Sequence, residues 1–144
     1  MTKGYEAFEK EVGRIQKDNE KLLSQFKKYL VVKGLSEKTI RNHVGNVDFY
    51  INEYLCYYDP PSEAKEGVYQ VYSFLGDWFV RKAMWASPAH IKSNAASFKK
   101  FYAWMVEEIG AVEKSDYEEM CAEIKSKMPE WLENAMDDED FDWF

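Results

Sequence analysis

The sequence contains few of the residues that form catalytic centres, bind metals or cross-link small domains. It has two cysteines, seven glycines and four prolines, and His43 and His90 are its only histidines. Cys56 and Cys121 lie far apart among apolar neighbours, so we interpret both as buried thiols rather than as a disulfide or a metal site. Without a metal-ligand pattern or a glycine-rich phosphate loop, we expect no enzyme, no catalytic residues, no metal, no cofactor and no small-molecule substrate.

Long apolar runs are absent as well. No stretch approaches the roughly 18 consecutive apolar residues that a membrane-spanning helix needs. The first residues, MTKGYEAFEKEVGRIQ, also lack the apolar core of a secretory signal peptide. These features predict a cytoplasmic protein with no membrane partner.

Strand-like alternation of apolar and polar residues is missing, whereas the 3.6-residue period of helices recurs along the chain. Apolar residues make up 46% of the chain and aromatic residues 17%, which is enough to form a core within 144 residues. We therefore predict an all-α fold with one main domain and terminal extensions.

The net charge of −7 is distributed unevenly. Residues 20–109 carry twelve basic and ten acidic side chains, whereas residues 110–144 carry three basic and twelve acidic ones. The last eight residues, DDEDFDWF, combine five acids with three aromatic rings. The acidity thus belongs to the C-terminal segment, so the negative total does not argue against a polyanionic partner for the middle of the chain.

Apolar residues spaced three and four apart from Tyr5 to Tyr29 predict helical structure with one polar interruption, Asn19. We expect a break near Asp18 and Asn19, because both residues are good N-caps and Gly13 weakens the helix before them. One long amphipathic helix and a coiled-coil seam with a buried Asn19 are the alternatives.

Caps and helix-breaking residues define the next two helical segments. Gly34 should end the first core helix in a left-handed conformation, which glycine adopts without strain. Ser36 can then cap a second helix, which should run to about Tyr57 and stop before Pro60 and Pro61.

A third helix is predicted over residues 67–85. Ser87 repeats the capping signal, and Pro88 follows it at the first helical position, where the missing N–H costs nothing. This fourth helix should end at Gly110. The chain between residues 20 and 110 therefore reads as two helical hairpins.

The two serine-capped helices repeat one pattern at a distance of 51 residues. Each serine is followed four residues later by an isoleucine, then by a basic residue and a short polar patch. The two apolar rows are Ile40, Val44, Val47, Ile51, Tyr54 and Tyr58, and Ile91, Ala95, Phe98, Tyr102, Met105 and Ile109. We infer paired helical hairpins that present two equivalent basic edges.

The polar sides of these helices are the strongest functional signal. The residues off the apolar rows are Lys38, Arg41, Asn42 and Asn46 on the second helix, and Lys92, Ser93, Ala96, Ser97, Lys99 and Lys100 on the fourth. Small residues between lysines let a helix approach a surface closely, and helix N-termini favour phosphate. The alternative is that these charges are simply solvated.

A C-terminal amphipathic helix is predicted over residues 113–136. Its apolar face contains Tyr117, Met120, Cys121, Ile124 and Met128. Pro129 should break this face, and the acidic aromatic tail follows over residues 137–144.

The run LSEKTIRN at residues 35–42, after a helix with Phe26 and Tyr29-Leu30 and the Gly34 turn, resembles a known module. Together with the Ser87-Pro88 start and the run FKKFY ahead of EEIG, it is similar to the N-terminal core-binding domain of tyrosine recombinases. That family domain is also called the SAM-like domain of phage integrases. The resemblance covers about residues 20–112.

The resemblance implies a SAM-like bundle of four core helices, over residues 19–112, whose second and fourth helices face double-stranded DNA. Carried onto matching positions, it nominates as DNA-binding residues Lys38, Arg41, Asn42, Lys92, Lys99 and Lys100. The family's catalytic domain, with its arginines, HxxR motif and nucleophilic tyrosine, needs far more than the 34 residues after Gly110. We therefore expect a DNA-binding module of DNA integration and recombination, from a mobile element, that does not cleave DNA.

A second hypothesis assigns the function to the acidic segment. Under either hypothesis residues 1–18 are predicted to form an N-terminal helical extension. In the second hypothesis the extra helices and the acidic aromatic tail after residue 112 would bind a protein. By resemblance, that partner is a full recombinase or a second copy of this chain, reached through the C-terminal helix.

Overall fold

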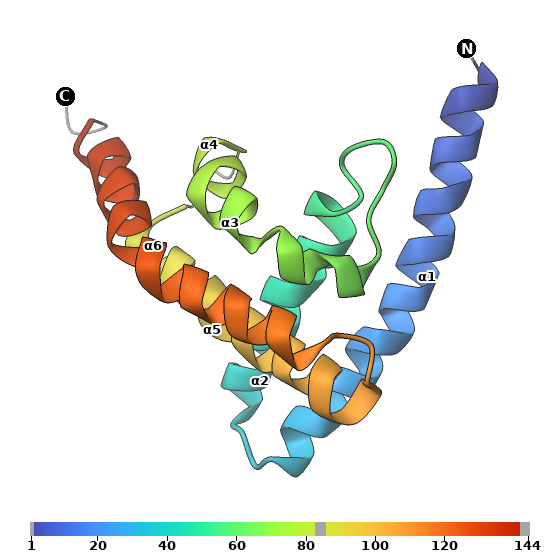
Figure 1. Ribbon diagram of the computed structural model, residues 1–144, viewed down its shortest axis with the longest axis horizontal. Coiled ribbons are helices and arrows are strands. Elements are labelled where there is room, and N and C mark those ends of the chain that lie inside the picture. Colours follow the sequence, from blue (N-terminus) through green and yellow to red (C-terminus); the bar gives the residue numbers. More distant parts are fainter. Residues whose placement is uncertain (1, 83–85, 142–144) are drawn as a thin grey trace. The chain divides into compact units, whose positions relative to one another are not determined.

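The computed structural model describes the backbone of residues 2–82 and 86–141, with side chains for residues 4–82 and 86–135 (Figure 1). Within these residues the chain is helical and contains no strand, so the predicted all-α class is confirmed. No helix in the described part is both long and apolar enough to cross a membrane.

The backbone forms two compact units, residues 1–67 and residues 68–144. The predicted integrase-like domain over residues 19–112 takes in parts of both units. Its boundaries and its SAM-like topology stay predictions.

In the first unit, α1 (Thr2–Val32) is one continuous helix, so the expected break at Asp18 and Asn19 is wrong. Asn19 is only 1% exposed, and its Nδ2 donates hydrogen bonds to the Ile51 carbonyl oxygen (3.2 Å) and to Oδ1 of Asn52 (2.8 Å). Because these partners lie on another segment, the amide is satisfied without ending the helix. The buried Asn19 of the coiled-coil alternative is present, but it bonds within the unit.

The α1 helix ends as the sequence predicts. Gly34 has a φ of 82°, and its N–H donates to the Val31 carbonyl oxygen (3.0 Å). The Leu35 N–H then reaches back to the Leu30 carbonyl oxygen (3.3 Å). These bonds satisfy carbonyl groups at the helix terminus and turn the chain toward the next helix.

The second helix consists of α2 (Glu37–Asp48) and a π-helical segment, Phe49–Tyr54. In the wider π turn the Leu55 N–H bonds the Tyr50 carbonyl oxygen (3.0 Å), five residues back. The helical path ends at this segment, so Tyr58 falls in the following turn and is 54% exposed. The last member of the predicted apolar row is therefore wrong.

The buried members of that row are Ile40, Val47, Ile51 and Tyr54. Tyr50, which the row omitted, is fully buried, and its hydroxyl donates to the Gly67 carbonyl oxygen (2.7 Å). Tyr50 lies three residues after the buried Val47 and four before the buried Tyr54, so ordinary helical spacing places it on the buried side.

The predicted third helix, residues 67–85, is a series of short segments. A 3₁₀ segment, Ala64–Tyr69, is followed by α3 (Val71–Ser73), a π-helical segment, Phe74–Trp78, and α4 (Phe79–Lys82). Residues 83–85, where this helix was expected to end, lie outside the described residues.

In the second unit, α5 (Pro88–Trp104) continues into a π-helical segment, Met105–Ile109, and stops at Gly110, whose φ is 72°. This ending agrees with the prediction. Ile109, the last member of the second apolar row, is 39% exposed, and it lies in a π-helical segment where the 3.6-residue period no longer holds.

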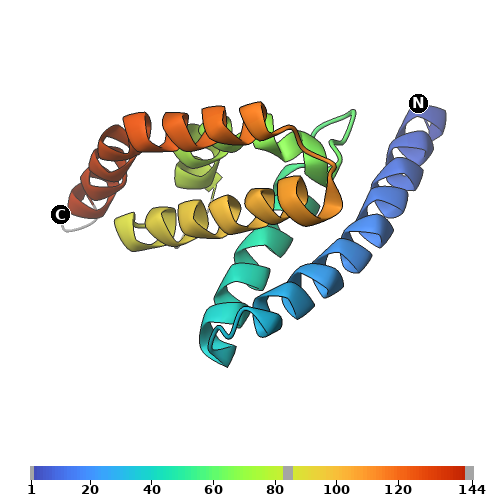
Figure 2. The same cartoon turned by 60° about the horizontal axis from the view of Figure 1, so that its bottom comes forward.

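The last helix, α6 (Lys114–Phe141), runs through Pro129, so the expected break there is wrong. An interior proline removes one backbone hydrogen bond and costs roughly 3 kcal/mol. Ile124 and Trp131, on either side of it, are 1% and 2% exposed, and this apolar packing offsets the loss. Figures 1 and 2 show α6 lying along α5.

Candidate nucleic-acid interface

The two serine caps have the same local geometry. The Ser36 Oγ accepts a hydrogen bond from the Thr39 N–H (3.2 Å), and the Ser87 Oγ accepts one from the His90 N–H (3.3 Å). Each serine also contacts the side chain of the same residue, at 2.9 Å for Thr39 Oγ1 and 2.7 Å for His90 Nδ1. The predicted caps are confirmed, and they set the start of both candidate DNA-facing helices.

On α2, the three predicted residues share one exposed side of the helix. Lys38, Arg41 and Asn42 are all exposed, and none forms an ion pair with another described residue. Gly45 lies beside them, one turn further on. A Cβ atom added there would have no neighbour within 4 Å, so the backbone itself is open to a partner.

On α5, Lys92, Lys99 and Lys100 are exposed, and within the described part of the chain no carboxylate pairs with them. The exposed Ala96 lies between them. The helix contains no acidic residue from Pro88 to Trp104. This side of α5 therefore has a small side chain at its centre, with lysines before and after it.

The predicted polar strip of α5 extends less far than expected. Ser97 is fully buried, and its hydroxyl donates to the Ser93 carbonyl oxygen (3.1 Å). Asn94 is 4% exposed and donates to the His90 carbonyl oxygen (2.8 Å). Polar side chains that bond the preceding helical turn can be buried, so residue type alone placed Ser97 on the wrong side.

The two helices can be aligned residue by residue at the 51-residue shift. Five of the pairs are Arg41 with Lys92, Asn42 with Ser93, His43 with Asn94, Gly45 with Ala96, and Asp48 with Lys99, whereas Lys38 aligns with Ala89 and Lys100 with Phe49. The first four pairs preserve chemical type, because they are basic, small polar, buried polar and small in both copies. The fifth pair reverses the charge.

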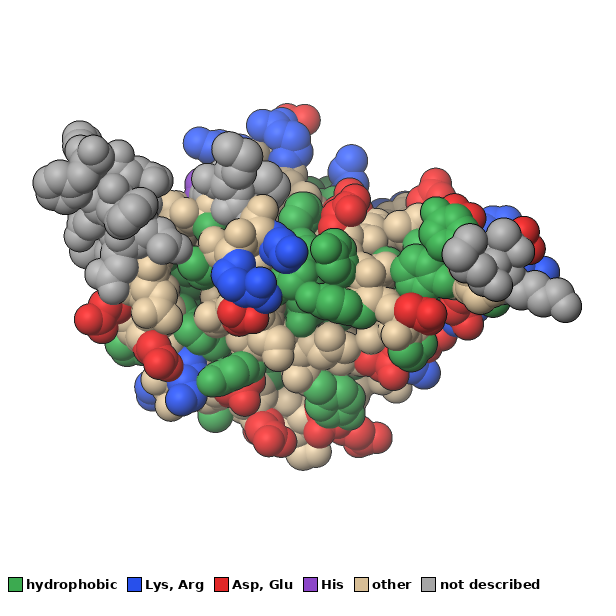
Figure 3. Space-filling model, turned by 90° about the horizontal axis from the view of Figure 1, so that it is seen from above, with side chains coloured by type: hydrophobic (Ala, Val, Ile, Leu, Met, Phe, Trp, Pro, Cys, Tyr) green, Lys and Arg blue, Asp and Glu red, His purple; other side chains and the backbone are tan. Residues whose placement is uncertain are grey.

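Other cations are neutralised locally. Arg81 makes two hydrogen bonds to the Asp77 carboxylate, at 2.8 and 2.9 Å, and Arg14 is held by Glu11, Asp18 and Glu63. Figure 3 shows carboxylates beside several cations on one face of the molecule. The hydrogen bond from Arg81 holds the pKa of the Asp77 carboxyl below its usual value. The five predicted cations, Lys38, Arg41, Lys92, Lys99 and Lys100, differ from these arginines because no carboxylate among the described residues pairs with them.

Several groups that could perform chemistry are buried or have a shifted pKa. Both cysteines are free; Cys56 is buried, and this burial raises the pKa of its thiol. Burial and the neighbouring Cys121 raise the pKa of Tyr117 to about 12. His43 is 9% exposed, beside the buried residues of α2. Among the described residues, no group of three His, Cys, Asp or Glu side chains could hold a metal ion.

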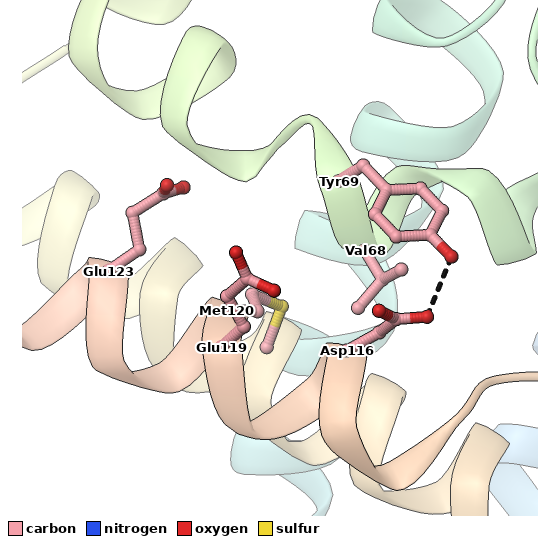
Figure 4. A pocket seen from close by; sticks show the side chains of 6 residues that line it. All are labelled: Val68, Tyr69, Asp116, Glu119, Met120 and Glu123. Atoms are coloured by element: carbon pink, nitrogen blue, oxygen red, sulfur yellow. Dashed lines mark hydrogen bonds between the residues drawn. The ribbon is translucent and has the colours of Figure 1, made fainter.

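One pocket was missed from the sequence. It measures about 100 Å³ and lies between α6 and the segment before α3 (Figure 4). Its lining residues are Val68, Tyr69, Asp116, Glu119, Met120 and Glu123. The Tyr69 hydroxyl donates to Oδ2 of Asp116 (2.7 Å), and this bond raises the pKa of Tyr69. The sequence signal that could have indicated this pocket is the spacing of Asp116, Glu119 and Glu123, which places the three carboxylates on one side of a helix.

No known protein family, curated protein or solved structure matches this chain. The resemblance to tyrosine recombinases therefore stays a prediction. The candidate interface depends on the exposure, charge and repeated geometry of α2 and α5.

Proposed function

We propose that this chain is a non-catalytic module that binds double-stranded DNA through the exposed sides of α2 and α5. It would act in DNA integration or recombination, in the manner of the core-binding domain of tyrosine recombinases. The observation that carries this proposal is the repeated face, which has a serine cap, a conserved cation position and a small residue beside it. Its cations have no carboxylate partner among the described residues, so they are available to phosphate.

The chemistry of the repeated face supports phosphate contacts rather than base readout. Lysine is a flexible point charge, and the small Gly45 and Ala96 allow the helix backbone to approach a duplex. A cation beside a helix N-terminus adds to the positive end of the helix dipole. Contacts of this kind position a protein on DNA without specifying sequence.

The test is a titration of a labelled duplex at several salt concentrations. One variant replaces with glutamine the five cations of the proposed interface: Lys38, Arg41, Lys92, Lys99 and Lys100. A control variant removes the same charge elsewhere, at Lys27, Lys33, Lys65, Lys114 and Lys125. If each of the five cations meets one phosphate, the interface variant should reduce the slope of log K against log salt by about 4 to 5.

The control should keep most of that slope. Equal effects of the two variants would show that net charge, rather than this interface, governs binding. The proposal fails if the chain binds no duplex at low salt, both as it stands and with the acids of residues 137–144 changed to amides.

The alternative function, a protein interaction through the acidic C-terminal segment, is favoured by the pocket in Figure 4. Asp116, Glu119 and Glu123 line it together with the exposed ring of Tyr69. A lysine- or arginine-bearing segment of a recombinase, or of a second copy of this chain, has the matching charge.

Deleting residues 111–144 is not a clean test of this alternative, because Met120, Ile124 and Trp131 are buried in the second unit. The double variant Glu119→Gln and Glu123→Gln removes charge from the exposed side of α6 without removing the helix. The alternative predicts weaker partner binding or weaker self-association in this variant. Unchanged association of both kinds would contradict it.

A further inference from the structure

The solvent side of α1 carries a row of cations that the repeated face does not include. Its members are Lys10, Arg14, Lys17, Lys21 and Lys28, at intervals of three, four or seven residues. Such intervals place side chains on one side of an α-helix. Ala7 and Ser24 occupy the remaining positions of the same row, and all these residues are exposed.

This row lies opposite the side that α1 buries. Ile15, Asn19 and Phe26 are at most 2% exposed, and they occupy other heptad positions than the cations of the row. From Lys10 to Lys28 the helix rises about 27 Å, at 1.5 Å per residue. The row is therefore long, straight and directed away from the core of the first unit.

Four of the five cations are electrostatically available. Arg14 is engaged with Glu11, Asp18 and Glu63, whereas Lys10, Lys17, Lys21 and Lys28 form no ion pair with any described residue. Shallow grooves run beside the row, and one of them is lined by Lys17, Glu20, Lys21, Ser24, Gln25 and Lys28.

We infer that these four lysines form a second contact for the phosphate backbone of duplex DNA, on α1 of the first unit. This inference rests on the proposed function and extends it to a helix that the recombinase resemblance does not assign to DNA. A duplex presents about one phosphate per 3.4 Å of its axis on each strand. Because each strand winds round that axis, the lysines of the straight row would meet only those phosphates that face α1. Ser24 and Gln25 add hydrogen-bond donors of the kind that contact phosphate.

The composition of the row separates DNA from other anionic partners. A protein partner would be anchored by large apolar or aromatic side chains, and the row from Lys10 to Lys28 contains none, although the exposed Val31 and Val32 follow it on α1. A membrane-surface helix inserts an apolar side into the lipid, but the apolar side of α1 is buried, with Phe26 and Leu30 at 0% exposure. A polar, single-sign row fits a polyanion that needs no apolar contact.

The test uses the full chain and two matched triple variants of the first unit. One carries Lys17→Gln, Lys21→Gln and Lys28→Gln, and the control carries Lys27→Gln, Lys33→Gln and Lys65→Gln. We expect the α1-row variant to lose about tenfold in duplex affinity at low salt and to reduce the salt slope by about 2 to 3. The control should change affinity by about twofold or less, because its cations are dispersed.

The outcomes distinguish this inference from the proposed function. If the α1-row variant behaves like its control while the chain still binds duplex through α2 and α5, this inference is overturned alone. If the row matters and the five-cation variant of α2 and α5 has no effect, the proposed interface is wrong and the row stands. A vesicle assay with about 30% anionic lipid tests the choice of partner. If the α1-row variant weakens vesicle binding but leaves DNA binding unchanged, DNA is the wrong partner for this row.

Discussion

The helices α2 and α5 are two versions of one design, and they differ most in charge. Both begin at a serine cap, bury an isoleucine four residues later and place a cation next to it. At the fifth matched pair, α2 has Asp48 where α5 has Lys99. The cap and the buried isoleucine are therefore the same in both helices, whereas the charge of the exposed residues differs between them.

The two helices also differ in packing. In α2 the buried row is built from medium-sized residues such as Val47, whereas α5 places Phe98 at the matching position, and both are at 0% exposure. Phe98 stands edge-on to Phe74, with ring centroids 5.8 Å apart. At this position the second copy therefore has an aromatic side chain where the first has an aliphatic one.

The substitution with the greatest predicted loss of stability tests this difference in packing. Phe98→Ala should lower the free energy of unfolding by about 3 to 5 kcal/mol, because it removes a buried ring and leaves a cavity. Val47→Ala, at the matched position of α2, removes less volume and should cost about 1 to 2.5 kcal/mol. Urea unfolding followed by circular dichroism measures both. Equal losses would contradict the assignment of the larger core contribution to α5.

The next prediction compares two glycines. A Cβ at Gly76 would lie 2.6 Å from Nε1 of the buried Trp131, so Gly76→Ala should destabilise the protein by about 1 to 3 kcal/mol. Gly45→Ala meets no neighbour within 4 Å and should stabilise it by about 0.5 to 1 kcal/mol.

Thermal unfolding of the two alanine variants provides the measurement, and the same sign of change in both would be inconsistent with this structure. Gly45→Ala also makes α2 resemble α5, which has Ala96 at this position. Its duplex affinity should therefore stay close to that of the original chain.

The two caps should be equivalent. Ser36→Ala and Ser87→Ala each remove a side-chain acceptor for a first-turn N–H and should each cost about 1 kcal/mol. Replacing the same serines with aspartate preserves an acceptor at each cap, so chemical denaturation should show stability close to the original. A loss in only one of the alanine variants would break the equivalence.

The charge difference can be tested by making α5 resemble α2. Lys99→Asp should reduce the slope of log K for duplex binding against log salt by about 1, because one phosphate contact is lost. Lys125→Asp makes the same change of charge on α6, away from the proposed interface, and serves as the control. A salt titration in which both variants behave alike would remove Lys99 from the interface.

The smallest expected effect concerns the ion pair between Arg14 and Glu63 in the first unit. The hydrogen bond from Arg14 lowers the pKa of Glu63 below its ordinary value of 4.5. Between the lowered pKa of the folded state and the ordinary value, the unfolded chain binds more protons than the folded chain. The free energy of unfolding therefore falls as the pH falls through the pKa of the folded state. Because the pair is exposed, the loss should be small, and Glu63→Gln should flatten the acid limb of a stability profile against pH.

Local rules in the sequence predicted much of this structure. The caps at Ser36 and Ser87 and the left-handed glycines at positions 34 and 110 follow from steric and hydrogen-bonding preferences of single residues. The exposed cations of the candidate interface follow from their place off the apolar rows.

The errors arose where distant residues override a local preference. The amide of Asn19 is buried because Ile51 and Asn52 receive its hydrogen bonds, and Pro129 is tolerated because buried residues pack on both sides of it. Tyr58 is outside the buried row because the helix ends before it, and Ile109 is exposed in a π-helical segment whose wider turn changes the periodicity. The pocket at Tyr69 needs α6 beside the segment before α3, which no single segment predicts.

The helical class, the caps and the unequal distribution of charge can be read from the amino-acid sequence, because they depend on residue type and on spacing within one helix. The unbroken α1 and the buried Ser97 become visible only after folding, because both depend on hydrogen bonds and apolar contacts formed when the helices pack. The tertiary structure also separated the neutralised cations, Arg14 and Arg81, from those lysines of α1, α2 and α5 that form no ion pair within the described part of the chain. For Arg14 the reason is physical proximity, since its partner Glu63 lies 49 residues away in the sequence and 3.0 Å away in space.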